Sequence, residues 1–477
     1  MSSAGSAHLL VASNRGPLTV VPVEDGDDKV TRGGGGLVSG MQAALSESPD
    51  AVWVCAALND RERALARQAP EGRISELPQV AEALGGEFDV NMLAIDAQTF
   101  RNAYNSIANS TLWFVLHRLY DLPTQPVFDA RWRREWASYV RFNEAFANAL
   151  ADAAAQGATV MVQDYHLFLV PRMLRDRRPD LKISIFTHTP WVSADYFTML
   201  PDDVSYALVD GMLGADVIGF HTQRWADLFA ETAREVTGKD DSVASGVAVF
   251  PLGTDPEEMA RLGDRRIVDS ELRVLNEIVG DRPLIGRVDR TELSKNVYRG
   301  LLAYRELLRT RPDWRGRVVH AVYNNPSRED LPAYREYTAR IERLAEEIDD
   351  EFATDEWTPL VFDIGDDYPT GLAIMRRADV VFVNSVRDGM NLVVLETLVL
   401  SERSPAVVVS REIGAAEVLG DDAFVVNPFD VTATAEALHQ ALTLPQDERA
   451  PRARRMRDAA VRLPPTQWFR AQLDALR

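Results

Sequence analysis

Short, uniformly apolar segments alternate with longer, charged segments along almost the whole sequence. The apolar runs are Leu9–Ala12, Thr159–Gln163, Ile183–Thr187, Val217–Phe220, Val247–Pro251, Leu284–Val288, Val318–Tyr323, Leu360–Ile364, Val380–Val383, Ala406–Ser410 and Phe424–Asn427. Runs without in–out alternation are typical of strands buried on both faces of a parallel sheet. The segments between them, such as Arg134–Ala153 and Leu331–Glu351, have helical spacing. The alternation therefore predicts an α/β chain built from repeated strand–helix–strand units.

A chain of 477 residues is too long for a single hydrophobic core, so we expect two domains. The break is predicted within Pro251–Asp281, a polar stretch that precedes a new strand. We predict two doubly wound, Rossmann-like domains, residues 1–255 and 256–455, that face each other across a cleft. Residues 456–477 are expected to include an amphipathic helix, over Gln467–Arg477, that could pack back on the N-terminal domain.

The formal charge of −20 argues against nucleic acid or an anionic membrane as a partner. Cys55 is the only cysteine, so no internal disulfide can form, and a reducing compartment fits. Its place in an apolar run favours a buried, unreactive thiol. No apolar run approaches the ~18 residues of a membrane span, and no signal peptide is evident. We expect a cytoplasmic protein that binds small molecules, and a homo-oligomer is compatible with the sequence.

Polar groups follow the predicted strands at the edge where open parallel sheets bind ligands. These residues are Arg15, Asp164, His188, Arg287, Lys295, Arg328, Asp388 and Asn391. Any one of them could be an ordinary surface group, but together they favour a ligand-binding cleft. In a strongly acidic chain, the four cations of this set would concentrate the positive charge that a phosphate ligand needs.

Two segments offer a helix N-terminus to a phosphate group. Gly33–Gly36 opens a helix predicted over Leu37–Leu45, and glycine lets a diphosphate approach the backbone closely. The run lacks the G-x-G-x-x-G fingerprint, which argues against a dinucleotide-dependent dehydrogenase. A second helix is predicted over Leu392–Leu400, and its lone carboxylate, Glu396, needs a polar partner such as a ribose diol.

Tyr104 and Trp113 lie nine residues apart in a segment, Phe100–Tyr120, whose spacing fits a helix. Core packing is the default interpretation, and stacking on a sugar would require both rings to face the cleft. The histidines His166 and His188 match no metal-ligand spacing, so we predict no metal site.

Several short motifs resemble those of the trehalose-6-phosphate synthases, which are retaining glycosyltransferases of the GT-B architecture. They occur in the family's order over essentially the whole chain: Ser13–Arg15, Gly35–Leu37, Asp164–Leu167, His188–Pro190 and Arg387–Leu392. The resemblance implies transfer of glucose from a nucleoside diphosphate glucose to glucose 6-phosphate, forming trehalose 6-phosphate. It implies no cofactor beyond these substrates and no metal.

The resemblance also implies roles for individual residues. On the donor side, His188, Arg287, Lys295 and Asp388 would be catalytic, with Gly35, Gly36, Asn391, Leu392 and Glu396 binding the donor. On the acceptor side, the residues would be Arg15, Trp53, Tyr104, Trp113, Asp164 and Arg328. Arg15, Tyr104 and Arg328 would bind the acceptor phosphate.

The chain departs from the family pattern on the donor side. The family commonly places its lysine five residues after the arginine and follows it with glycine, whereas Arg287 and Lys295 are eight apart and Asn296 follows. Gln163 stands where histidine is usual, and Tyr323–Pro326 is unusual near the nucleotide base. These changes favour GDP-glucose over UDP-glucose as the donor, although the asparagines could simply shape the turn before Pro326.

Three other functions stay open within this fold. A pseudo-glycosyltransferase of the validoxylamine-phosphate synthase type shares the unusual donor side, but those relatives alter the acceptor aromatics, and Tyr104 and Trp113 are kept here. A glucosylglycerol-phosphate synthase is another candidate. A non-catalytic sugar-phosphate sensor would be expected to lose donor-binding residues, and none is lost.

Overall fold

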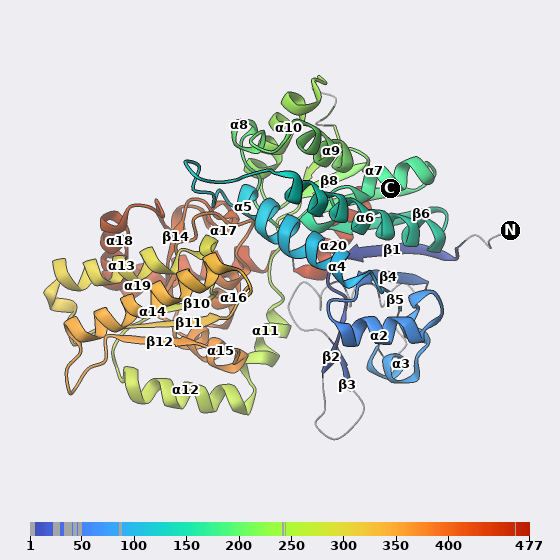
Figure 1. Cartoon of the computed structure of the whole chain (residues 1–477). Helices are drawn as coiled ribbons and strands as arrows, with labels where there is room; N and C mark the ends of the chain where they lie inside the picture. The colour runs from blue at the N-terminus through green and yellow to red at the C-terminus, as the bar shows by residue number, and fades with distance from the viewer. Residues whose placement is uncertain are drawn as a thin grey trace. The chain divides into compact units, whose positions relative to one another are not determined.

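The structure, a computed structural model, describes residues 5–21, 29–32, 41, 45, 50–84, 88–240, 243, 245–462 and 464–477. It divides into two compact units (Figure 1). The first unit is Met1–Pro251 together with Pro465–Arg477, and the second unit is Leu252–Pro464.

A parallel sheet forms the centre of the first unit. Among the described residues its strand order is β5-β4-β1-β6-β7-β8-β9. The strands are β1 (Ala7–Ser13), β4 (Ala51–Ala56), β5 (Asp89–Leu93), β6 (Ala154–Gln163), β7 (Lys182–Thr187), β8 (Val217–Phe220) and β9 (Val247–Val249). A separate antiparallel pair is formed by β2 (Leu18–Val21) and β3 (Lys29–Arg32).

A second parallel sheet forms the centre of the second unit, with the order β12-β11-β10-β13-β14-β15 in the described chain. The strands are β10 (Leu284–Arg290), β11 (Val319–Asn325), β12 (Leu360–Ile364), β13 (Val380–Val383), β14 (Ala406–Ser410) and β15 (Phe424–Val426). This is the order of a doubly wound, Rossmann-like sheet. The predicted α/β class is therefore confirmed, with one such sheet in each unit.

Strand order reverses direction at one point in each sheet. In the first unit this point lies between β1 and β6, and in the second unit it lies between β10 and β13. The connections from these two strands leave on opposite sides, and in folds of this kind ligands bind at the carboxyl ends of such strands. Each sheet thus marks its own candidate binding edge.

Helices cover both faces of the sheets. In the first unit they are α2 (Asp60–Gln68), α3 (Pro78–Leu84), α4 (Ala97–Arg101), α5 (Trp113–Leu116), α6 (Ala130–Ala153), α7 (Val170–Arg177), α8 (Ala194–Phe197), α9 (Asp202–Met212), α10 (Gln223–Thr237) and α20 (Pro465–Asp474). In the second unit they are α11 (Pro256–Gly263), α12 (Arg266–Val279), α13 (Val297–Thr310), α14 (Pro332–Phe352), α15 (Tyr368–Arg377), α16 (Leu392–Leu400), α17 (Gly414–Leu419), α18 (Val431–Thr443) and α19 (Gln446–Ala460). Figure 1 shows α13 and α14 on one face of the second sheet and α12 and α15 on the other.

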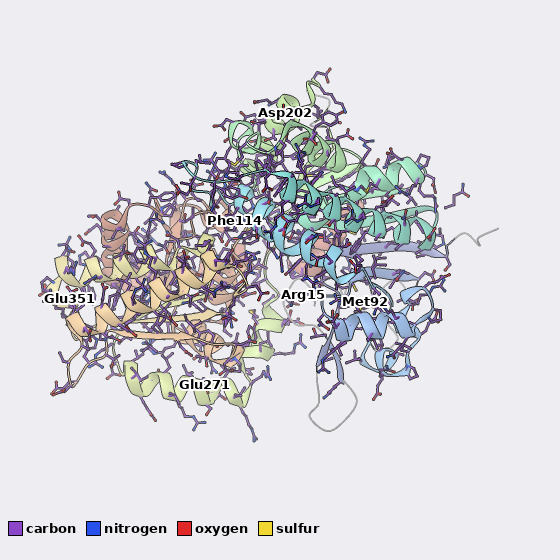
Figure 2. All side chains as sticks on the ribbon, viewed as in Figure 1. Arg15, Met92, Phe114, Asp202, Glu271 and Glu351 are labelled. Atoms are coloured by element: carbon purple, nitrogen blue, oxygen red, sulfur yellow. The ribbon has the colours of Figure 1, made fainter. Side chains whose placement is uncertain are left out.

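Local sequence explains where several of these helices begin and end. The Asp129 carboxylate accepts a hydrogen bond from the backbone N–H of Trp132 and so caps α6. Gly238, at a φ of 65°, ends α10 in the left-handed region that glycine adopts without strain. Along the outer edge, Glu351 near the end of α14 (Figure 2) forms ion pairs with Arg305 and Arg309 and ties α14 to α13.

The C-terminal helix α20 belongs to the first unit. Its Trp468 is completely buried, and the indole N–H donates to the carbonyl oxygen of Phe250 at 3.1 Å. The same ring meets Phe186 of β7 edge to face, with centroids 4.7 Å apart. No helix in the described part of the chain is both long and apolar enough to cross a membrane.

His320, in the middle of β11, is a fully buried titratable group. Its Nδ1 donates to the carbonyl oxygen of Ile285 on β10 at 2.9 Å, an arrangement that suits the neutral ring. Burial, aided by the charge of Arg287 and opposed by this hydrogen bond, lowers the pKa of His320 to about 3. The folded protein therefore keeps His320 neutral in mildly acidic solution.

This lowered pKa predicts a specific loss of stability in acid. Below about pH 6.5 the unfolded chain protonates His320 and the folded chain does not, so the free energy of unfolding should fall by up to about 1.4 kcal/mol per pH unit. Urea unfolding at pH 7.5 and pH 5 should show the wild-type protein losing about 2 kcal/mol more than His320→Gln. Equal pH dependence in the two proteins would contradict the prediction.

Candidate functional site

Arg15 follows β1 at the binding edge of the first sheet and is exposed (Figure 2). The turn that carries it is held by the Ser13 hydroxyl, which donates to the carbonyl oxygen of Arg15 at 2.7 Å. The indole N–H of Trp53 donates in turn to that hydroxyl at 2.8 Å. Trp53 is completely buried and supports the turn from inside the protein. Trp53 was placed in the acceptor site from the sequence, and its burial does not fit that role. Gly16 completes the turn, since a Cβ there would lie 2.5 Å from Cys55 Sγ.

Tyr104 and Trp113 are presented by a π-helix, Asn102–Leu112, that continues into α5. In an α-helix of 3.6 residues per turn, two residues nine apart would face opposite sides. A π-helix uses more residues in each turn, so nine residues span about two turns and bring both rings to one side. Their contacts agree: Tyr104 stacks on His166 at 5.6 Å, and Trp113 meets Tyr165 at 5.7 Å.

Asp164 and His188 follow β6 and β7 and are linked directly. The backbone N–H of His188 donates to Asp164 Oδ1 at 3.1 Å, and Asp164 has a φ of 74°. Such a backbone conformation is uncommon for a residue with a side chain and is often found at functional sites. The structure thus brings these two predicted residues together.

The His188 ring lies among Gln163, His221 and Trp468. Its Nε2 is 3.1 Å from Gln163 Oε1, so Nε2 carries the proton in this contact. Burial, with the neighbouring His221, holds the pKa of His188 well below its usual range. The His188 imidazole is therefore kept in its neutral form. The predicted glycines Gly35 and Gly36 lie outside the described residues.

Arg287 lies inside the second sheet, because it belongs to β10, which extends to Arg290. Its side chain is 1% exposed, and its guanidinium pairs with Asp289 at 3.0 Å. It also donates to Asn384 Oδ1 and to the carbonyl oxygen of Lys295, both at 2.5 Å. α13 leaves room for it at Gly300, where a Cβ would lie 2.6 Å from Nη1. This burial gives Arg287 a structural position, in contrast to the predicted contact with the donor.

Lys295 and Asp388 meet at the strand-order reversal of the second sheet. Lys295 Nζ lies 2.5 Å from Asp388 Oδ2 and 3.9 Å from Asp289 Oδ1. Asn391 Nδ2 donates to the same Asp388 oxygen at 3.1 Å, while its own Oδ1 caps α16 through the N–H of Val394. Lys295, Asp388 and Asn391 were all predicted from sequence, and the fold gathers them at one helix N-terminus, where negative charge is favoured.

Leu392 and Glu396 lie on α16, directly beyond this cluster. Glu396 is half-buried, and burial together with the charge of Glu258 raises its pKa to about 7. Within the part of the chain that the structure describes, the Glu396 carboxyl group has no hydrogen-bond or ion-pair partner. It is therefore suited to accept hydrogen bonds from the hydroxyl groups of a ligand.

Arg290 is the residue that the sequence analysis missed. It is the last residue of β10, its side chain is 49% exposed, and it lies 3.2 Å from Glu292 Oε1. It precedes Lys295 by five residues, which is the family spacing, so that spacing was a signal that could have identified it. Arg328, after β11, pairs with Glu292 Oε2 at 2.6 Å and with the hydroxyl of Tyr334 at 2.8 Å. The second unit thus presents Arg290, Lys295 and Arg328 near the ends of β10 and β11.

These groups can bind and stabilise anions. Positive charge that is fixed in advance near a developing negative charge lowers the barrier to its formation. Among the described residues, no cluster of three or more His, Cys, Asp or Glu side chains is close enough to hold a metal ion.

Comparison with known proteins gives one consistent result. Residues 7–477 match the sequence model of glycosyltransferase family 20. The chain is similar to a trehalose-6-phosphate synthase of Mycobacterium sp. strain JLS, with 32% identity over 99% of this chain and 96% of the relative. It is also similar to a validamine 7-phosphate valienyltransferase of Streptomyces hygroscopicus, with 33% identity over 93% of this chain and 88% of the relative.

A solved structure agrees over the full length. The UDP-forming alpha,alpha-trehalose-phosphate synthase of Burkholderia xenovorans, in complex with glucose-6-phosphate, matches with a TM-score of 0.80 and 25% identity. The match covers 98% of this chain and 100% of that structure.

The geometry predicts opposite effects for two arginines of one strand. Arg290→Ala should weaken binding of a nucleoside diphosphate by about tenfold or more, because a charged contact is lost, and leave the melting temperature nearly unchanged. Arg287→Ala should destabilise the fold by about 3–5 kcal/mol, because Asp289 would remain buried without its partner. Calorimetric titration and thermal unfolding measure the two effects. A destabilised Arg290→Ala with normal nucleotide affinity would contradict the assignment.

Proposed function

Because the chain belongs to glycosyltransferase family 20, we propose that it transfers glucose from a nucleoside diphosphate glucose to glucose 6-phosphate, with retention, forming trehalose 6-phosphate. The observation that supports this most strongly is the Lys295–Asp388 contact at the N-terminus of α16. The contact places a cation that can bind a diphosphate next to a carboxylate that can bind sugar hydroxyls. Both groups lie at the edge of the second sheet where ligands bind in this fold. The relatives named as trehalose-6-phosphate synthases support the same reaction.

In the proposed reaction, the bond between glucose C1 and the diphosphate oxygen breaks, and C1 bonds to the acceptor hydroxyl on the same face. The proton of that hydroxyl passes to the departing phosphate oxygen. Lys295, Arg290 and the N-terminus of α16 would stabilise the charge on the leaving group. His188 and Asp388 would hold the donor glucose, and Glu396 the ribose. The chemistry uses only the two substrates, with no metal or other cofactor.

We assign acceptor recognition to Arg15, Tyr104, Trp113, Asp164 and Arg328. An exposed arginine suits a phosphate because its planar group binds two oxygens at once. Tyr104 is half-buried and offers apolar surface to a sugar ring, while the largely buried Trp113 packs against Tyr165 on the same side of the π-helix. We propose a cytoplasmic location, on the sequence argument that a lone cysteine fits a reducing compartment.

Valienyl transfer to a phosphosugar analogue is the second candidate. The specific observation in its favour is the similarity to the validamine 7-phosphate valienyltransferase, which is as high as that to the synthase. The two candidates differ in the substrates that they require, so one assay separates them.

The proposed function predicts a defined product. The purified protein, given glucose 6-phosphate and a nucleoside diphosphate glucose, should form an α,α-linked disaccharide phosphate, detected by mass spectrometry and NMR. Lys295→Ala should turn over about 10²-fold more slowly, because it lacks a preorganised charge at the leaving group. Free glucose should not replace glucose 6-phosphate. Absence of product with every nucleoside diphosphate glucose would refute the function and favour the valienyl transferase.

The base of the donor is a finer question, and we propose GDP-glucose as the preferred donor. The spacing from Arg287 no longer supports this choice, since Arg290 keeps the family spacing. Asn325 does support it. The Asn325 Nδ2 donates to the carbonyl oxygen of Gly365 at 3.1 Å, and its Oδ1 has no partner among the described residues. That oxygen can accept from the adjacent N–H donors of a guanine. Asn324, by contrast, is completely buried and cannot reach a base.

This proposal predicts a measurable preference. The kcat/KM for GDP-glucose should exceed that for UDP-glucose by about tenfold, because the wrong base leaves a polar group unpaired. Asn325→Ala should lower the value for GDP-glucose and leave that for UDP-glucose nearly constant. Competition of GDP-, UDP- and ADP-glucose at equal concentration measures the preference, and an equal or higher kcat/KM for UDP-glucose refutes it.

A further inference from the structure

Glu292 is a completely buried carboxylate beside the candidate donor site. It directly precedes a short 3-10 segment, Leu293–Lys295, that follows β10. A carboxylate removed from water is costly unless charged or hydrogen-bonding partners surround it. The groups that contact Glu292 therefore indicate what its charge does in the folded protein.

Two arginines share this one carboxylate. Arg328 Nη1 lies 2.6 Å from Oε2, and Arg290 Nη1 lies 3.2 Å from Oε1. The hydroxyls of Tyr334 and Ser327 donate to the same two oxygens, at 2.8 Å and 2.7 Å. Each oxygen thus forms an ion pair with one guanidinium and accepts a hydrogen bond from one hydroxyl group.

The carboxylate is ionised in the folded protein. Burial alone would raise the pKa of Glu292, but Arg290, Arg328 and the two hydroxyl groups outweigh it and lower the pKa. An ionised carboxylate orients a guanidinium more strongly than a neutral acceptor does.

The two arginines come from different segments of the chain. Arg290 ends β10, and Arg328 lies in the segment after β11, with a φ of 49°. Both side chains are long and would lose considerable rotamer freedom on binding a ligand. A shared buried acceptor fixes their orientation before any ligand arrives, which reduces that loss.

We propose that Glu292 is a positioning residue that holds Arg290 for the donor diphosphate and Arg328 for the acceptor phosphate. Recognition of the two substrates then depends on one buried charge. This inference rests on the proposed function, which supplies the two phosphate ligands.

The test is Glu292→Gln, which keeps the shape of the side chain and removes its charge. One carboxylate oxygen is replaced by an amide NH2 group, which cannot accept from a guanidinium, and the remaining oxygen carries no charge, so both arginines are held more weakly. We expect the Kd for a nucleoside diphosphate and the Kd for glucose 6-phosphate each to rise by about tenfold or more. By contrast, Arg290→Ala should weaken only the nucleotide, and Arg328→Ala only glucose 6-phosphate. Calorimetric titration with GDP, UDP and glucose 6-phosphate measures both constants without turnover.

Asp379 provides a matched control. It is a buried carboxylate that also holds two arginines, Arg377 at 2.6 Å and Arg403 at 3.2 Å. It precedes β13, at the opposite edge of the sheet from the candidate site. Asp379→Asn should lower the melting temperature and leave both dissociation constants unchanged, which separates positioning from general stability.

A second variant keeps the inference testable if Glu292→Gln folds poorly. Glu292→Asp retains the charge but withdraws it by one methylene, so both constants should rise by an intermediate factor. Wild-type affinity for either ligand in both Glu292 variants would overturn the inference alone. A wild-type protein that binds neither a nucleotide nor glucose 6-phosphate would overturn the proposed function together with it.

Discussion

The buried guanidinium of Arg287 organises the second unit. A guanidinium that is always charged is costly inside a sheet unless partners compensate it, and here Asp289, Asn384 and the carbonyl oxygen of Lys295 bind its two Nη groups. The last contact fixes the chain just beyond β10. Arg290, Glu292 and Lys295 all lie in or beside that short stretch. The buried charge of Arg287 therefore helps to set the positions of the Arg290 and Lys295 side chains.

The two units carry different chemistry. The second unit supplies cations, with Lys295 against Asp388, and with Arg290 and Arg328 on a shared carboxylate. The first unit supplies His188, which burial keeps uncharged, and two rings on one side of a π-helix, together with Arg15 and the carboxylate of Asp164. This division suits the proposed reaction, in which the diphosphate of one substrate leaves as an anion and the other substrate offers a sugar hydroxyl. In a chain of net charge −20, these grouped cations would supply the positive charge that the proposed phosphate ligands need.

Apolar runs predicted most of the two sheets, because buried parallel strands leave a strong signal. Every predicted strand is present, and β8, β12, β13 and β14 have the predicted bounds. The prediction omitted β5, whose burial alternates at the sheet edge, so Asp89–Leu93 lacks a continuous apolar run. It also omitted β4, where an apolar run was noticed only as the surroundings of Cys55.

The sequence alone determined the fold class and the polar residues that follow the strands, because buried strands and strand ends have distinct residue patterns. It did not determine which of those residues face a ligand. Arg287 and Arg290 are both arginines at the end of one apolar run, and only the true length of β10 buries the first and exposes the second. Similarly, Tyr104 and Trp113 share a side only because the helix between them is wound as a π-helix. Strand length and helix winding depend on hydrogen bonds and packing with distant segments, which residue spacing does not encode.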